Sequence, residues 1–297
     1  MTSAPLFSAL RFGVSGFQHP EWKGLVYPRE AGIRRHPLET LSRAVDAVEI
    51  DRPVRAETAQ VWLHAVRDNP QFLFSAVLPR SFTYQRTLPA QTIASYKQGL
   101  WPLHRAGRLG AVVMEFPWAF RYSKENREFL IRLRRAFHEF ALAAEFRHES
   151  WGYDEAVGTL IDYKVGIVNL DQPAYFRAMA PGALLTSPVA YVRLHGRAGK
   201  EAFQEYEAPA PPPYLYTRGE LEEWRPRIER LATHAECALV IATSTGRGRS
   251  VVNALQLQAL VNGVAREAPP ELLEIYHRDL AEFRSRRPIQ PRLLEVA

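Results

Sequence analysis

Cysteine is nearly absent from the sequence. Cys237 is the only one among 297 residues, which excludes a disulfide bond within the chain. It comes directly before the apolar run 238–241, which is typical of a buried strand, so we interpret it as a buried thiol rather than a nucleophile. A chain without disulfides suits a reducing compartment, and we therefore expect a cytoplasmic protein.

Long apolar runs are lacking too. No stretch approaches the ~18 consecutive apolar residues that a membrane-spanning helix requires, so we expect no membrane partner. The first ten residues have no charged segment followed by an apolar one. We therefore expect no secretory signal peptide.

Glycine-rich nucleotide-binding motifs are also missing. No G-x-G-x-x-G pattern follows an apolar run, and Gly246 and Gly248 lie in Thr-Gly-Arg-Gly-Arg, which lacks the third glycine and the P-loop lysine. A nucleotide site is therefore not favoured, and the cofactor stays unknown at this point.

The sequence does have the composition of an ordinary globular protein, with 46% hydrophobic and 24% charged residues. The length allows a large core, and no shift in composition marks a boundary, so we predict a single domain over residues 1–297. The formal net charge of +6 permits a phosphate-bearing or polyanionic partner without requiring one.

Apolar runs alternate with segments of helical periodicity along the chain. Eight runs are typical of strands, at residues 11–16, 47–51, 72–78, 111–116, 142–148, 165–171, 189–196 and 238–243. Helical patterns cover residues 38–44, 56–68, 91–105, 124–137, 153–163, 218–233, 250–264 and 271–284. Continuous apolar strands are typical of parallel sheets covered on both faces. We therefore predict an α/β protein with a (β/α)8 TIM-like barrel, irregular between the sixth and seventh strands, with a doubly wound open sheet as the alternative.

Polar side chains gather at the ends of five predicted strands. Side chains alternate along a strand, so each of these strands has one apolar face and one face that becomes polar toward its C-terminal end. In a barrel the polar face would point into the C-terminal mouth, where barrel enzymes hold their sites. The residues are Glu49 and Asp51, Glu115, Glu145 and Arg147, Asn169 and Asp171, and Tyr191, Arg193 and His195.

Several chemistries suit this set. A glycosidase would use two of the carboxylates, but the seventh strand offers Arg193 and His195 in place of an acid. A divalent metal could bind carboxylates and imidazoles, but no compact ligand spacing occurs and the arginines oppose a cation, so we do not favour a metal. An anion site, with arginine donors and a carboxylate as general base, suits the residues at least as well.

The same segments resemble the DUF72 family of YecE-like proteins. The matching segments are Arg11–Phe17 with Trp22, Gly24 and Tyr27-Pro28, then Val48-Glu-Ile50, Ala144-Glu-Phe-Arg-His148 with Trp151, Tyr191–Gly196, Leu221 with Trp224, and Asn253–Leu257. They follow in the family's order over nearly the whole chain. The resemblance implies a TIM-like barrel and leaves the reaction open.

The chain departs from the family pattern at positions expected in the mouth. The resemblance implies a lysine where Val77 stands, a glutamine where Glu115 stands and a histidine where Tyr84 stands. The family's Asn-Ser-Thr-Phe-Tyr corresponds to residues 51–55, and its Phe-Asn-Asn to residues 242–244. The fifth and seventh strands thus keep the family pattern, while the facing half of the mouth differs.

We predict that the mouth binds a small anionic or polyhydroxyl ligand and supports acid–base catalysis; whether the protein is an enzyme is left open. We predict catalytic roles for Glu145, His195 and Asp171, and ligand-binding roles for Arg147, Arg193, His148, Glu49, Asp51, Glu115, Ser15 and Trp151. The two arginines would hold an anion, a carboxylate would act as base, and the imidazole of His195 would give or take a proton.

Two alternatives belong to other classes of function. A nucleic-acid-associated protein is suggested by a set of basic residues, namely Arg127, Arg132, Arg134, Arg135, Arg247 and Arg249. A pseudo-enzyme or partner scaffold with a degenerate site is suggested by the departures at Asp51, Val77 and Thr243. Neither is preferred over a small-molecule ligand.

Overall fold

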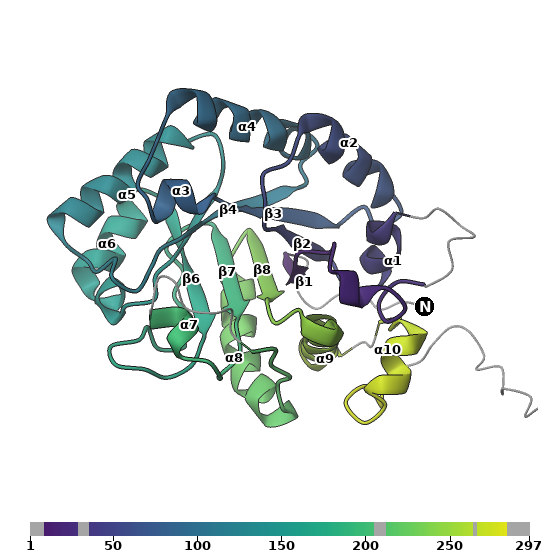
Figure 1. Ribbon diagram of the computed structural model, residues 1–297. Coiled ribbons are helices and arrows are strands. Elements are labelled where there is room, and N and C mark those ends of the chain that lie inside the picture. The colour runs from purple at the N-terminus through teal and green to yellow at the C-terminus, as the bar shows by residue number, and fades with distance from the viewer. Residues whose placement is uncertain (1–8, 29–35, 205–211, 264–265, 284–297) are drawn as a thin grey trace, which may run out of the picture.

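The computed structural model describes residues 9–28, 36–204, 212–263 and 266–283. At its centre eight parallel strands close into a barrel in chain order, from β1 to β8 (Figure 1). The strands are β1 Leu10–Ser15, β2 Ala47–Ile50, β3 Leu73–Val77, β4 Leu109–Glu115, β5 Leu142–Glu145, β6 Val165–Asp171, β7 Val189–Leu194 and β8 Cys237–Ala242. The predicted (β/α)8 barrel is confirmed, and the open sheet is excluded because β1 pairs with both β2 and β8.

Helices cover the outside of the barrel (Figure 1). The longer ones are α1 Pro37–Ala44, α2 Ala56–Ala65, α4 Ala90–Arg105, α5 Lys124–Ala136, α6 Asp154–Asp162, α8 Arg218–His234, α9 Arg249–Asn262 and α10 Pro270–Ile275. Short turns of helix occupy loops: α3 Arg80–Thr83, α7 Glu201–Gln204, and the 3-10 turns η1 Pro20–Trp22, η2 Glu149–Gly152 and η3 Gly246–Gly248. The sequence did not predict these short elements, because three or four residues are too few to display a helical period.

Two expectations at the element boundaries have different outcomes. Residues 172–188, between β6 and β7, contain no helix, as predicted. The helix predicted over 271–284 is wrong in its second half, since α10 ends at Ile275 and residues 276–282 form turns. Tyr276 leaves the helical conformation with ψ of 37°, and the carbonyl of Asp279 accepts a hydrogen bond from Gln256 of α9 instead of a helical one.

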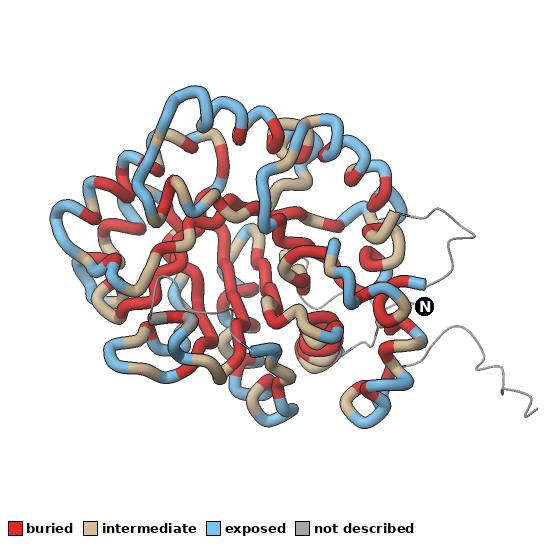
Figure 2. Tube along the Cα trace, in the orientation of Figure 1, coloured by how far each residue is buried: buried red, intermediate tan, exposed pale blue. Residues whose placement is uncertain are grey.

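The strand register determines which side chains face the barrel interior. Ser15 lies beside Glu49 on the next strand, Glu49 lies beside Ser75, and Glu115 lies beside Glu145. The opposite faces pack under the helices as the apolar core, and Figure 2 shows the strands buried and the helices exposed along their outer sides. Close approach of β1 to β2 requires glycine at position 13, where an added Cβ would lie 2.3 Å from the carbonyl oxygen of Ala47.

In the part of the chain that the structure describes, no helix is both long enough and apolar enough to cross a membrane. The cytoplasmic location stays a prediction. The single domain over residues 1–297 also stays a prediction, although all eight strands of the barrel come from residues 10–242.

Candidate functional site

Six ionisable side chains meet inside the barrel at the C-terminal ends of the strands. We call them the inner cluster: Glu49, Glu115, Glu145, Arg147, Arg193 and His195. They come from β2, β4, β5 and β7 and from the segments that follow β5 and β7. Five are buried, and the side chain of Glu115 is the most accessible, with 23% of its surface exposed. Charges this deeply buried require partners.

Arg193 lies at the centre of the inner cluster. Its Nη2 donates to Glu49 Oε1 at 2.9 Å, and its Nη1 donates to Glu145 Oε2 and, at 3.3 Å, to Glu115 Oε2. A guanidinium presents a rigid fork of donors, so one arginine can contact three carboxylates from three strands.

Arg147 closes the other side of the cluster. Its Nη2 donates to Glu115 Oε1 at 2.5 Å and its Nε to Glu145 Oε1 at 3.2 Å. The ring of Phe203 from α7 lies over this guanidinium, 4.9 Å from its central carbon, and 5.3 Å from the ring of His195. Phe203 therefore packs against both the guanidinium of Arg147 and the imidazole ring of His195.

Both ring nitrogens of His195 face acceptors. Nε2 lies 3.2 Å from Glu145 Oε2, and Nδ1 lies 2.9 Å from the hydroxyl of Thr243. That hydroxyl donates its own proton to the carbonyl of Leu194 at 3.1 Å, so it accepts from the imidazole. The doubly protonated imidazolium satisfies this arrangement, which places a proton donor against Glu145.

Neutral hydroxyls complete the hydrogen bonding of the carboxylates. Tyr191 donates to Glu49 Oε2 at 2.8 Å and accepts from Ser75 at 2.6 Å, since its single proton is already used. Ser15 donates to Glu49 Oε1 at 2.9 Å, and Tyr84 donates to Glu115 Oε1 at 3.1 Å. The carboxylates are thus held by hydroxyls as well as by cations.

The ion pairs decide the protonation of the glutamates. Burial acts to raise the pKa of Glu145, but Arg193, His195 and Arg147 outweigh it and hold that pKa well below its usual range. Burial also acts to raise the pKa of Glu115, and Arg147 and Arg193 together lower it. Burial opposes the charge of Arg193, yet the surrounding glutamates raise its pKa well above the usual value. Near neutral pH Glu115 and Glu145 are therefore ionised and face charged arginines.

Charge within the inner cluster is balanced. Three carboxylates face two guanidiniums and an imidazolium, so the group carries no net charge when His195 is protonated and one negative charge when it is not. Such a cluster does not attract a free anion by its overall charge. The interactions it can still offer are hydrogen bonds, above all at the accessible carboxylate of Glu115.

Asp171, predicted as a mouth residue, lies outside the inner cluster. In β6 it is Val168 and Leu170 that lie beside the inward Tyr191 and Arg193, so Asn169 and Asp171 face outward. The carboxylate of Asp171 accepts from the indole N–H of Trp224 on α8 and from Arg197, whose Nη2 lies at 2.9 Å. The structure thus corrects the predicted facing of this strand end.

Three further predicted residues also lie apart from the inner cluster. Trp151 is fully buried on the outer face, where its ring stacks on Phe146 at 3.9 Å. His148 caps η2, with its Nδ1 accepting from the backbone N–H of Ser150 at 3.1 Å. Asp51 is exposed at the rim and pairs with Arg52 at 3.1 Å.

Of the predicted site residues, the structure brings seven together. They are Ser15, Glu49, Glu115, Glu145, Arg147, Arg193 and His195.

Sequence reasoning did not assign site roles to several residues that contact the cluster: Ser75, Tyr84, Tyr191, Phe203 and Thr243. Ser75 and Tyr191 had a usable signal, because each is a polar residue in an apolar strand in phase with the cluster residues. Tyr84 and Phe203 lie in loops, where no periodicity indicates which side chains turn inward.

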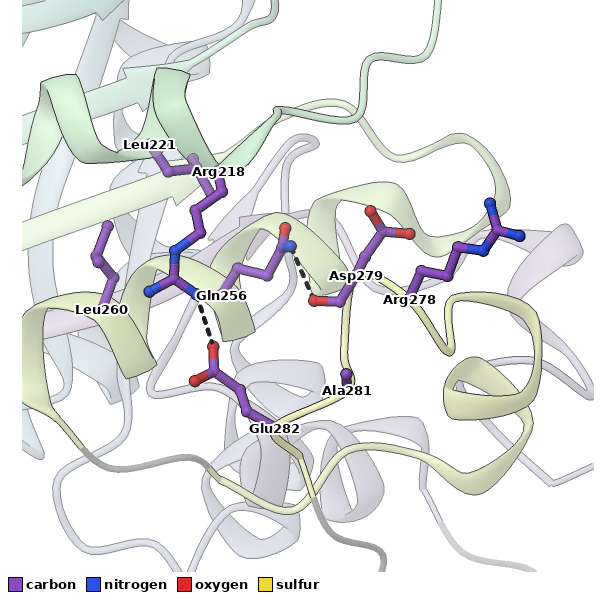
Figure 3. A pocket seen from close by; sticks show the side chains of 8 residues that line it. All are labelled: Arg218, Leu221, Gln256, Leu260, Arg278, Asp279, Ala281 and Glu282. Carbon is purple, nitrogen blue, oxygen red and sulfur yellow. Dashed lines mark hydrogen bonds and ion pairs between the residues drawn. The ribbon is translucent and has the colours of Figure 1, made fainter.

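One cavity, of about 260 Å³, lies outside the barrel wall, between α8, α9 and the segment after α10. Figure 3 shows Arg218 reaching toward Glu282 across it and Gln256 bonded to the backbone at Asp279. It shares no residue with the inner cluster. Among the described residues, no three His, Cys, Asp or Glu side chains are grouped so as to hold a metal ion.

Comparison with known proteins identifies relatives along nearly the whole chain. Residues 11–273 match the model of a family described as "Protein of unknown function DUF72". The UPF0759 protein YunF of Bacillus subtilis is 21% identical over 273 residues, which is 84% of this chain and 95% of that protein.

Solved structures include similar barrels. A DUF72 family protein from Thermotoga maritima superposes with a TM-score of 0.71 and 27% identity, covering 85% of this chain and 98% of that one. A DUF72 family protein from Enterococcus faecalis gives a TM-score of 0.72 at 22% identity, over 85% of this chain and 95% of that one. The second likeness concerns the fold alone.

Proposed function

The chain belongs to the DUF72 family of proteins of unknown function, and from the site that its barrel builds we propose that it binds a small polyhydroxyl ligand at the C-terminal mouth. The observation that carries this proposal is the carboxylate of Glu115, which is partly exposed at the end of a buried, charge-balanced cluster. We further propose that His195 exchanges a proton with the bound ligand and that Glu145 stabilises the charged imidazole ring.

The hydrogen bonds of Glu115 favour a hydroxyl as its ligand. A carboxylate offers about four acceptor positions, and the side chains of Arg147, Tyr84 and Arg193 use three of them. One remains for a donor from outside, which a ligand hydroxyl supplies and an anion does not. The bond would be charge-assisted, since the pKa of Glu115 is lowered by Arg147 and Arg193 against the effect of burial.

Charge balance favours the polyhydroxyl form of the ligand over the anionic form at this cluster. Both terminal nitrogens of Arg193 already donate to glutamates, as do Nε and Nη2 of Arg147, so an anion at these atoms would compete with a glutamate. Such an exchange replaces one charge-assisted bond by another and yields little net affinity. A neutral hydroxyl adds a bond and displaces none.

The catalytic part of the proposal rests on the pair of His195 and Glu145. The imidazole Nε2 lies 3.2 Å from the carboxylate, and the hydroxyl of Thr243 fixes the ring from its other side. A histidine oriented in this way can donate a proton to a ligand and recover it, while the glutamate stabilises the charged ring. Asp171 takes no part in this proposal, because its carboxylate faces α8.

The nucleic-acid alternative has less support from the described residues. On α5 the side chains of Arg132 and Arg135 line a surface hollow together with Glu125 and Glu128, so charges of both signs alternate there. Arg127 and Arg134 donate to Thr159 and to the carbonyl of Tyr163. Binding to the phosphate backbone of a nucleic acid requires a continuous positively charged surface, which these residues do not form.

Isothermal titration calorimetry with glucose, xylose and myo-inositol tests the proposal. We expect at least one of the three to bind, and we expect Glu115→Gln to weaken it about tenfold or more, because the ligand loses a bond to a charged acceptor. Asp51→Asn is the matched control, since this exposed carboxylate at the rim contacts no member of the cluster. Binding of none of the three at millimolar concentration, or equal effects of both variants, would contradict the proposal.

A further inference from the structure

Two buried ring nitrogens in the loops that follow β4 and β5 have no hydrogen-bond partner among the described residues. One is the indole Nε1 of Trp118, in the loop between β4 and α5, and the other is Nε2 of His148, just after β5. The side chain of His148 is 1% exposed, and the two rings lie 5.4 Å apart between their centroids. Buried polar groups without partners are rare, and a pair in adjacent rings calls for a common cause.

Both groups are donors. Indole nitrogen can only donate. His148 Nδ1 accepts from the backbone N–H of Ser150, which also can only donate, so the proton of the neutral ring sits on Nε2. Burial, together with Arg121 and Arg177, lowers the pKa of His148 and keeps the ring neutral.

Two arginines lie near these donors. The guanidinium of Arg121 lies 4.9 Å from the ring of Trp118, and Arg177, which pairs with Glu149 at 2.7 Å, acts electrostatically on His148. A water molecule that accepted from both N–H groups would still carry two hydrogens of its own, which the nearby arginines repel. An oxygen carrying negative charge accepts without donating.

We propose that Trp118 and His148 form an oxyanion subsite that binds the carboxylate or phosphate group of a ligand. Both residues follow strands that contribute to the inner cluster: Trp118 comes three residues after Glu115, at the end of β4, and His148 comes directly after Arg147. If the proposed function holds, and this step rests on it, the ligand is an acidic polyhydroxyl molecule: its hydroxyls meet Glu115 and its charged group meets the subsite. The anion thus has a place separate from the arginines that the glutamates already occupy.

Binding of inorganic phosphate and of acetate to the full chain tests the subsite by itself. We expect calorimetry to detect at least one of them, with phosphate alone indicating a phosphoryl group and acetate alone a carboxylate. Trp118→Phe keeps the ring and removes the donor, and His148→Asn keeps an oxygen that can cap η2 and removes Nε2. Each variant should weaken the anion about tenfold, since a hydrogen bond to a charged group is lost.

Trp101→Phe and His138→Asn are the matched controls, because these residues lie on α4 and after α5, away from the subsite. Unfolding midpoints show whether each variant is folded. If His148→Asn does not fold, Trp118→Phe alone is enough to test the subsite. Absence of binding by both anions at millimolar concentration, or equal affinity in the wild type and Trp118→Phe, overturns the subsite.

A second series separates this inference from the proposed function. Gluconate and glucose 6-phosphate are compared with glucose, and Trp118→Phe should remove the preference for the acid while leaving the affinity for glucose unchanged. Glu115→Gln should weaken all three. If glucose fails to bind while phosphate or acetate binds through Trp118, the proposed function fails and the subsite stands; a preference for the acid that survives Trp118→Phe contradicts the subsite alone.

Discussion

At the scale of single residues, Arg193 holds the three carboxylates of the inner cluster together. Three glutamates from three strands accept from its guanidinium, and its side chain is 6% exposed. Removal of one partner from a buried ion pair leaves the other charge uncompensated and costs about 3–5 kcal/mol. We therefore expect Arg193→Met to lower the free energy of unfolding by about that amount, measured by urea denaturation.

Arg225→Met serves as the comparison for Arg193→Met. Arg225 pairs with Glu229 on the exposed side of α8, and such i,i+4 pairs contribute about 0.3–0.5 kcal/mol. A loss for Arg193→Met as small as that for Arg225→Met would mean that the glutamates can ionise without this arginine, which contradicts the charge balance described above.

Residue-level prediction from sequence succeeded where strands carry polar side chains and failed in the loops. Alternation along β2, β4, β5 and β7 placed Glu49, Glu115, Glu145 and Arg193 together correctly. Tyr84 and Phe203 contact the same cluster from short loop helices, whose direction depends on tertiary packing and is not encoded in a period.

At the scale of elements, β6 shows what alternation alone cannot decide. The alternation correctly placed Asn169 and Asp171 on the same face of β6. It does not say which face lies inside the barrel, since both faces are largely apolar in the N-terminal part of the strand. Register resolves it, because Leu170 lies beside Arg193 and Asp171 therefore turns outward. The missed cue was Trp224, whose indole N–H, on an otherwise apolar face of α8, needs an acceptor.

Asp171 therefore has a structural role between β6 and α8, and Asp171→Asn tests it. Trp224 Nε1 and Arg197 Nη2 both donate to Oδ2, while Arg197 Nε donates to Oδ1. The amide can accept at one atom only, so with its oxygen at the Oδ2 position its NH2 group faces Arg197 Nε, and the negative charge that Arg197 pairs with is lost. We expect the free energy of unfolding to fall by about 1.5–3 kcal/mol, while the affinity of any mouth ligand changes less than twofold.

Calorimetry and urea denaturation on the same Asp171→Asn preparation check this expectation together. Loss of ligand binding at unchanged stability would return Asp171 to the catalytic role that the sequence suggested. The control is Glu223→Gln, which removes the exposed carboxylate that also pairs with Arg197 at 2.8 Å and should change neither quantity appreciably.

At the scale of the whole molecule, the inner cluster joins distant parts of the barrel wall. The hydrogen bond from Arg193 to Glu49 connects residues 144 positions apart, and that from Tyr191 to Glu49 connects residues 142 apart. β1 closes the wall between β2 and β8, and Ser15 at its end donates to the same Glu49. Ionisation of the cluster is therefore coupled to the stability of the closed barrel and not only to the local strand ends.

This coupling predicts how stability depends on pH. Arginines, with His195 acting on Glu145, lower the pKa of Glu115 and Glu145 below the ordinary glutamate value of 4.5, in spite of burial. A carboxyl whose pKa is lower in the folded state stabilises that state fully above the unfolded pKa, and the contribution is lost as pH falls through the folded pKa. We therefore expect urea midpoints of the wild type to begin falling below about pH 4.5 on account of these two groups.

Glu115→Gln separates the share of this one carboxyl from general acid denaturation. When unfolding changes the number of bound protons by one, the free energy of unfolding changes by about 1.4 kcal/mol per pH unit. Loss of one titrating carboxyl should therefore reduce the slope of the free energy of unfolding against pH in the acid range, here called the acid limb, by up to that amount. Glu57→Gln, on the exposed start of α2, should leave the limb unchanged. Equal acid limbs for wild type and Glu115→Gln would show that the cluster does not remain ionised in the folded barrel, and the charge-balanced site would have to be abandoned.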